Sequence, residues 1–148
     1  MAAHNDLGRW GEDMAAQYLI DHGWYIRHRD WHDGHRDIDI VAIDGDMSML
    51  LMVEVKTRTS SEMGEPDEAI DSEKRNNIIM AASRYVKECR LGNLEVRYDT
   101  ISVVGTPDTR YTIEHKENAF NVADQYMFYD ECRRKAYTKN KKRPGCWG

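Results

Sequence analysis

The sequence lacks the features of membrane proteins, secreted proteins and disulfide-rich proteins. Its longest wholly apolar run, residues 49–53, has five residues, whereas a helix that crosses a membrane needs about 20. The opening segment MAAHNDLGRW has neither the basic region nor the apolar region of a signal peptide. The 3 cysteines are odd in number, far apart and without a C-x-x-C pair, so reduced thiols are expected. These absences predict a cytoplasmic protein without membrane contact.

Basic residues are outnumbered by acidic residues over most of the chain. The net charge is −5; residues 1–120 hold 14 Lys or Arg against 23 Asp or Glu, whereas residues 121–148 hold 7 against 3. The acidic balance argues against a general nucleic-acid binder, and we expect some of the carboxylates to be metal ligands. The basic end is most simply a solubilising tail, although its cations could add salt-dependent attraction to phosphates.

The length and composition fit one soluble domain, because 148 residues, 41% of them apolar and 32% charged, can bury a substantial core. Apolar periodicity, capping residues and turn residues predict the elements. Helices are expected from Asn5 or Asp6 to about Asp21, from Asp71 or Ser72 to about Arg90, and after residue 120. Strands are expected at 24–29, 37–43, 49–56, 94–104 and 111–115, with polar loops at 30–35 and 62–66. This order predicts an α/β fold with a mixed sheet.

Charged residues lie at the open end of a predicted hairpin. The strands at 37–43 and 49–56 are joined by the turn signal Asp-Gly-Asp. Side chains alternate along a strand, so Asp37 shares a face with Asp39, and Glu54 shares a face with Lys56. In an antiparallel hairpin these two pairs should lie next to each other. Any of these charges would be costly to desolvate alone, so their convergence predicts a bound divalent cation.

Magnesium chemistry accounts for this combination of residues. Mg²⁺ prefers oxygen ligands, often one or two carboxylates together with water and a substrate phosphate. Such a cation makes water more acidic, and Lys56 could orient or deprotonate that water. Glu12 borders the buried face of the first helix. An E-x-K tripeptide by itself is more often an ordinary ion pair, but the D-x-D of the neighbouring strand favours phosphodiester hydrolysis.

The combined motifs resemble a known family. The chain is similar to the YraN-like family of uncharacterised bacterial proteins, within the PD-(D/E)XK nuclease superfamily, and to archaeal Holliday junction resolvases. The matching segments are GRWGE at 8–12, DIDIVA at 37–42, VEVKTR at 53–58, Lys74, Ala81 with Tyr85, RYD at 97–99 and NAF at 118–120. The resemblance implies a restriction-endonuclease-like fold, with three α/β/α layers and a central mixed sheet flanked by helices, in residues 1–120. Residues 121–148 lie outside the resemblance, and their own pattern predicts a C-terminal helix and basic tail.

The resemblance also implies roles for individual residues. Mg²⁺ or Mn²⁺ would be bound by Asp39, Glu54, Glu12 and the backbone of Val55, with Lys56 as the catalytic lysine. These residues would make the protein a metal-dependent endonuclease that hydrolyses DNA phosphodiester bonds. Branched or single-stranded DNA would be the substrate, and a homodimer is expected because such resolvases act as two-fold dimers.

The sequence departs from the family pattern immediately before Asp39. Arg36 and Asp37 stand where the family has Gly and Glu; the shorter Asp37 is therefore expected only to support the site. Arg36, His35, Arg58 and Lys74 are the expected DNA contacts. This departure favours an alternative function, a non-catalytic nucleic-acid-binding module with the same fold.

Histidines near this segment offer a second candidate metal site. His28, His32 and His35 lie among aspartates, and zinc sites use histidines at short spacing. No cysteine is near, and a strand followed by a loop would scatter the rings, so solvated histidines are the simpler expectation. Trp31 is expected to pack, although on a loop it could stack against a base.

Overall fold

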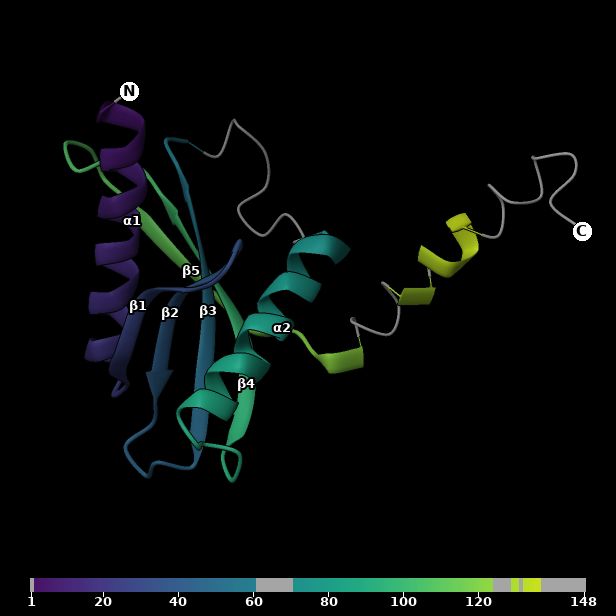
Figure 1. Cartoon of the computed structure of the whole chain (residues 1–148). Helices are drawn as coiled ribbons and strands as arrows, with labels where there is room; N and C mark the ends of the chain where they lie inside the picture. The colour runs from purple at the N-terminus through teal and green to yellow at the C-terminus, as the bar shows by residue number, and fades with distance from the viewer. Residues whose placement is uncertain (1, 61–70, 124–128, 131, 137–148) are drawn as a thin grey trace, which may run out of the picture.

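The computed structural model describes residues 2–60, 71–123, 129–130 and 132–136. Two helices and five strands follow one another along the chain (Figure 1). Their bounds are α1 Ala2–Asp21, β1 Tyr25–Asp33, β2 Arg36–Ile43, β3 Met49–Arg58, α2 Ser72–Glu88, β4 Glu95–Val104 and β5 Thr112–Phe120. The side chain of Asp71 caps α2 by accepting a hydrogen bond from the Lys74 N–H, as expected for an N-cap aspartate.

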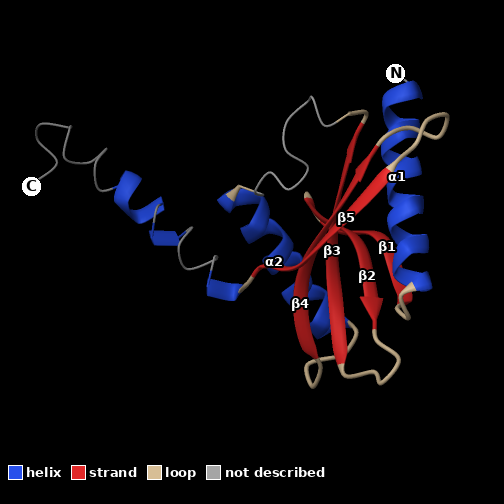
Figure 2. Ribbon diagram, turned by 180° about the vertical axis from the view of Figure 1, so that it is seen from behind, coloured by secondary structure: helices blue, strands red, loops and turns tan. Residues whose placement is uncertain are grey.

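The five strands form one mixed sheet in the order β1-β2-β3-β4-β5 (Figure 2). The pairs β1–β2, β2–β3 and β4–β5 are antiparallel, whereas β3 and β4 are parallel. A parallel pair needs a long crossover connection, and the segment that contains α2 supplies it. The predicted mixed sheet is therefore confirmed.

Helices cover both faces of the sheet, with α1 on one side and α2 on the other (Figures 1 and 2). The apolar residues of β3 divide between the two cores. Leu51 and Val53 pack with Leu19 of α1, whereas Leu50 and Met52 pack with residues of α2. A strand that is buried on both faces reads as a continuous apolar run, which explains residues 49–53. The expected three-layer α/β/α fold is confirmed.

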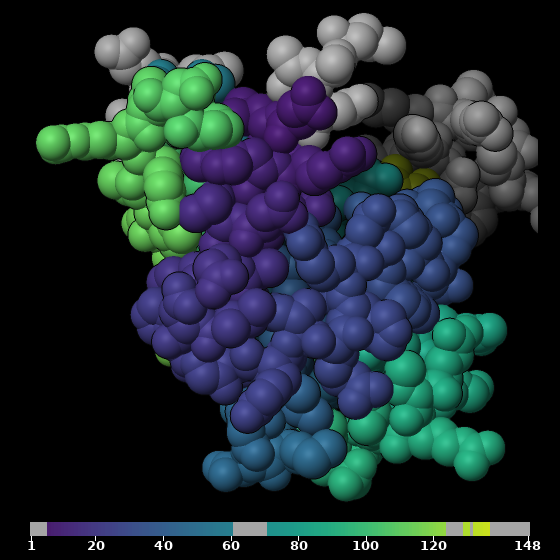
Figure 3. All heavy atoms as spheres, turned by 90° about the vertical axis from the view of Figure 1, so that its left-hand side faces the viewer, coloured from purple at the N-terminus to yellow at the C-terminus, as the bar shows by residue number. Residues whose placement is uncertain are grey.

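The first helix also contacts the far end of the sheet. Trp10 meets the ring of Tyr111 edge-on, with 5.5 Å between ring centroids. In the space-filling view of this side, the segment that precedes β5 lies beside the upper part of α1 (Figure 3). This contact and the core around Leu19 hold α1 along the sheet, which positions the acidic residue that α1 carries.

Several predicted bounds are wrong. The first helix begins at Ala2, ahead of Asn5, because alanine has a high helix propensity. The polar loop predicted at 30–35 is instead the end of β1, which pairs with β2 as far as Asp33, so that only residues 34 and 35 form the turn. An edge strand can carry polar side chains, and a positive φ of 52° at Asp30 interrupts the regular alternation. The last strand continues to Phe120, well beyond the predicted end.

The predicted loop at 62–66 and the basic tail from residue 137 onward lie outside the described residues. The division into a domain at 1–120 and a C-terminal extension stays a prediction. Among the described residues beyond β5, 122–123, 129–130 and 132–136 are helical. None of the helices that the structure describes is long and apolar enough to cross a membrane.

Candidate active site

The site begins where β2 and β3 separate. Their antiparallel pairing runs from Ile43–Leu50 to Ile40–Val53, and the next residue on each strand is an acid, Asp39 on β2 and Glu54 on β3. The Oδ2 atom of Asp39 accepts a hydrogen bond of 2.8 Å from the Val55 N–H. At this point a side chain, and not a backbone carbonyl, accepts the hydrogen bond between the strands. This bond holds the Asp39 carboxylate beside Glu54, as the hairpin register predicts.

A cavity of about 250 Å³ opens beside these two acids. Carboxylates from three different elements line it, namely Glu12 of α1, Asp39 of β2 and Glu54 of β3. Its other lining residues are Leu7, Gly8, Val55 and Thr57. The structure therefore brings together the three side chains that the sequence nominates as metal ligands, and the Val55 backbone lies with them.

A glycine allows α1 to approach the sheet closely enough to deliver Glu12. A Cβ atom added to Gly11 would lie 1.9 Å from Oγ1 of Thr57 on β3, a separation that real atoms do not adopt. With any larger residue at position 11, either the Thr57 side chain or the helix would have to move. Because Glu12 is the next residue, its place in the cavity depends on this contact.

Burial and mutual repulsion raise the pKa values of the three carboxyl groups. Burial, followed by the charge of Asp39, raises the pKa of Glu54 to about 8. Burial also raises the pKa of Asp39, although the hydrogen bond from Val55 opposes that shift. The pKa of Glu12 is raised by burial and then by Asp39. The Oε2 atom of Glu54 is buried without a hydrogen-bond partner among the described residues. The charged forms of these carboxylates are therefore disfavoured.

One lysine partly offsets this charge. The Nζ atom of Lys74, on α2, lies 3.5 Å from Oδ1 of Asp37 and 3.5 Å from Oε1 of Glu54. Burial acts to lower the pKa of Lys74, but Glu54 and Asp37 outweigh it and the pKa is raised. The structure thus places Lys74 among the acids themselves. Sequence reasoning nominated it as a DNA contact and missed this ion pair, because α2 lies far along the chain from β2 and β3.

The remaining nominated residues are not among those that line the cavity, and Arg36 lines a separate pocket against α2. Lys56 and Arg58 follow Glu54 along β3 and are half-buried. His35 lies in the turn between β1 and β2, and Arg36 begins β2. The Arg36 Nε is buried without a hydrogen-bond partner in the described part of the chain. The roles nominated for these residues stay predictions.

A second acidic group, which could bind a metal ion, lies beside the first. Asp30, His32 and Asp37 have ligand atoms within 4.8 Å of one another, and the His32 Nε2 lies 3.0 Å from an oxygen of Asp30. The grouping of His28, His32 and His35 considered from sequence does not form. The His28 ring instead makes a hydrogen bond of 2.7 Å to the Tyr85 hydroxyl of α2, whereas His32 pairs with Asp30 and His35 lies in the turn after β1.

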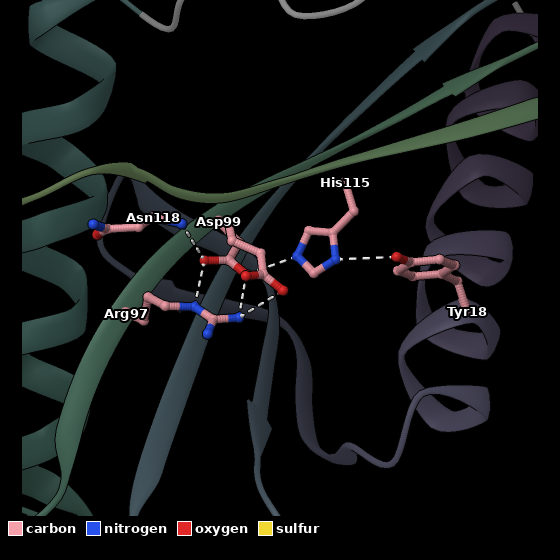
Figure 4. Close-up of polar contacts among 6 residues, drawn as sticks. Tyr18, Arg97, Asp99, His115 and Asn118 are labelled. Atoms are coloured by element: carbon pink, nitrogen blue, oxygen red, sulfur yellow. Dashed lines mark hydrogen bonds and ion pairs between the residues drawn. The ribbon is translucent and has the colours of Figure 1, made fainter.

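A buried polar network lies between α1 and the far strands, and it was not foreseen from sequence (Figure 4). The fully buried Asp99 accepts two hydrogen bonds from Arg97, at 2.9 and 2.8 Å, and one of 2.9 Å from the Asn118 N–H. The His115 ring bridges Asp99, at 2.7 Å, and the Tyr18 hydroxyl, at 3.2 Å. The network thus ties β4 and β5 to α1, the helix that carries the acid of the cavity.

The available sequence signal for this network was an acid at an inward position of an apolar strand. Asp99 precedes Ile101 and Val103 at alternate positions of β4, and both of these pack in the core under α1. Burial acts to raise the pKa of Asp99, but hydrogen bonds from His115 and Arg97 outweigh it, so that the pKa is lowered. The network therefore stabilises the charged form of the carboxylate.

Comparison with known proteins identifies the family. The uncharacterised protein family UPF0102 matches residues 11–103. A UPF0102 protein of Phocaeicola vulgatus is 44% identical over 120 residues, which are 81% of this chain and 96% of that protein. A UPF0102 protein of Chlorobaculum parvum is 40% identical over 130 residues, covering 84% and 99%. Among solved structures, Pyrococcus furiosus SfsA in complex with Ca²⁺ covers 77% of this chain and 63% of its own, with 11% identity and a TM-score of 0.36. The chain belongs to the UPF0102 family, and the predicted YraN-like membership is confirmed.

Proposed function

We propose that this member of the UPF0102 family is a cytoplasmic, metal-dependent endonuclease that hydrolyses DNA phosphodiester bonds. The observation that carries the proposal is the convergence of Glu12, Asp39 and Glu54 on one cavity. Three neighbouring carboxylates are unfavourable without a cation, and they come from three separate elements of the fold. A surface ion pair would not need this arrangement.

The donor set fits Mg²⁺ or Mn²⁺. Carboxylate and carbonyl oxygens are the ligands that such hard cations prefer, and the buried Glu54 Oε2 has no hydrogen-bond partner in the described residues that would compete for it. Asp39, Glu54, Glu12 and the backbone carbonyl of Val55 would hold the cation. When bound, it supplies Lewis-acid chemistry by offsetting the negative charge that develops on the phosphate.

The chain itself supplies the positive groups around this centre. Lys56 lies two residues beyond Glu54 on the same strand. Its ammonium would orient the attacking water and stabilise negative charge on the phosphate, whereas its neutral amine could take the proton of that water. Arg58, Arg36, His35 and Lys74 would contact the DNA backbone. Branched or single-stranded DNA is the proposed substrate, and a two-fold homodimer would present two such sites.

A cleavage assay tests this proposal. Labelled four-way junction, flap, single-stranded and duplex DNA would be incubated with the protein and Mn²⁺. The wild type should cut at least one of them, whereas Lys56→Ala should bind the same DNA without cutting it. Lys116→Ala, at an exposed lysine of β5, is the matched control and should cut normally. If the wild type shifts DNA in a gel but cuts nothing with Mg²⁺ or Mn²⁺, the non-catalytic binding module is the better function.

A further inference from the structure

Lys74 connects α2 with the carboxylates of the cavity. Its ammonium is 3.5 Å from oxygens of both Asp37 and Glu54. The Lys74 side chain is 36% exposed, whereas the Glu54 side chain is 14% exposed. The ammonium therefore sits at the boundary between the buried acids and solvent, and it can reach both.

The fold holds the backbone of Lys74 in place while leaving its side chain movable. The N–H of Lys74 donates a hydrogen bond of 2.8 Å to the capping residue Asp71, and the helix packs on the sheet through Ile78 and Tyr85. The flexible four-carbon stem of a lysine lets the ammonium swing without any movement of the helix. A change in charge at the cavity can thus move the ammonium alone.

The two oxygens of Glu54 have different surroundings. Oε1 faces the Lys74 ammonium, whereas Oε2 is buried and has no hydrogen-bond partner among the residues that the structure describes. A divalent cation bound through Oε2 would share one carboxylate with the ammonium. Like charges at such short range repel each other strongly in a partly buried site, so the bound cation would weaken the contact between Lys74 and Glu54.

We propose that Lys74 is the internal counter-ion of the metal-free site, which competes with the divalent cation for Glu54 and moves toward solvent when the cation binds. The inference rests on the proposed metal centre. Lys74 lowers the repulsion among the acids while the cation is absent, and it weakens cation binding for the same reason. Once displaced, its ammonium becomes available to a DNA phosphate.

Calorimetric titration of the full chain with Mn²⁺ tests the competition. Lys74→Met removes the charge while keeping an unbranched side chain with a good helix propensity. We expect it to bind Mn²⁺ about tenfold more tightly than the wild type, which is an ordinary size for coupling between two bound groups. Lys74→Arg, which keeps the charge, and Lys87→Met, at an exposed lysine of the same helix, should bind like the wild type. Equal or weaker Mn²⁺ binding by Lys74→Met would overturn the inference.

Lysine acetylation followed by mass spectrometry gives a readout that is independent of affinity. Adding Mn²⁺ to the wild type should increase the acetylation rate of Lys74 several-fold relative to that of Lys87. An unchanged rate, in protein that calorimetry shows to be saturated with Mn²⁺, would overturn the counter-ion role and leave the proposed nuclease intact. If neither the wild type nor Lys74→Met binds Mn²⁺, the metal centre and the nuclease proposal fail together with this inference. Binding by Lys74→Met alone would be the strongest support.

Discussion

Replacing Glu54 by Gln is expected to stabilise the metal-free protein at alkaline pH, although it removes a proposed metal ligand. Burial and the neighbouring Asp39 raise the pKa of Glu54 from 4.5 to about 8. A group whose pKa is higher in the folded state stabilises that state fully below its unfolded pKa, and the contribution is lost as the pH rises through the folded pKa. The wild type should therefore lose stability between about pH 4.5 and pH 8.

The size of this loss of stability follows from the shift in the pKa of Glu54. One pKa unit corresponds to about 1.4 kcal/mol, so an increase from 4.5 to about 8 corresponds to at most roughly 5 kcal/mol at pH above 8. Because Glu54 and Asp39 influence each other, we expect the measured effect to be about 3–5 kcal/mol. A glutamine resembles the protonated acid in shape and can donate a hydrogen bond to Asp39, so Glu54→Gln should not show the loss.

Urea unfolding in the presence of a chelator, followed by circular dichroism from pH 5 to pH 8.5, measures this effect. The free energy of unfolding of Glu54→Gln should exceed that of the wild type at pH 8.5, and the difference should shrink toward pH 5. Glu114→Gln, at an exposed position of β5, is the control and should follow the wild type. A Glu54→Gln protein that is equally stable or less stable than the wild type at pH 8.5 would refute the reasoning. Mn²⁺ should reverse the order, because only the wild type retains all the ligands.

Two further predictions concern stability. Asp99→Asn should lower the free energy of unfolding by about 3–5 kcal/mol at pH 7, because it leaves buried donors without their charged acceptor, whereas Asp13→Asn, at an exposed ion pair, should cost less than about 1 kcal/mol. Folding lowers the pKa of Asp99, so its carboxylate stabilises the protein above the unfolded pKa and stops doing so as the pH falls through the folded pKa. The difference in unfolding free energy between the wild type and Asp99→Asn should therefore shrink near pH 3. A difference that stays constant with pH would contradict this. Gly11→Ala should destabilise the protein by about 1–3 kcal/mol through its clash with Thr57 and weaken Mn²⁺ binding. Gly8→Ala, whose Cβ would meet no described atom within 4 Å, should instead stabilise the protein by about 0.5–1 kcal/mol, because alanine has the higher helix propensity.

Contacts away from the cavity hold α1 in place against the repulsion among the acids. Neighbouring carboxylates destabilise a metal-free protein, and the rest of the fold must compensate for them. The core under α1 and the network around Asp99 hold that helix against the sheet independently of the cavity. Glu12 can then stay close to Asp39 despite their repulsion. Stability and the proposed chemistry thus depend on different contacts of the same helix.

Much of the fold could be predicted from local sequence patterns. The two-sided burial of β3 follows from its apolar run, and the hairpin turn with the alternation of side chains predicts that Asp39 meets Glu54. The first strand was predicted to end at Arg29, four residues too early, because the polar residues that follow look like a loop. Their backbone is nevertheless satisfied by pairing with β2, and such pairing depends on the partner strand more than on the polarity of β1 itself.

By itself, the sequence determined the order of the elements, the two faces of β3 and the meeting of Asp39 with Glu54, because turn residues and a period of two are local properties. Only the tertiary structure decided three other contacts. Gly11 lets α1 pack close enough to bring Glu12 to the cavity, and Lys74 of α2 pairs with Glu54 of β3. Asp99 of β4 binds residues of β4 and β5. These contacts join residues that are far apart in the chain. A periodic pattern predicts which face of an element is buried, but the packing of helices on the sheet determines which residues that face contacts.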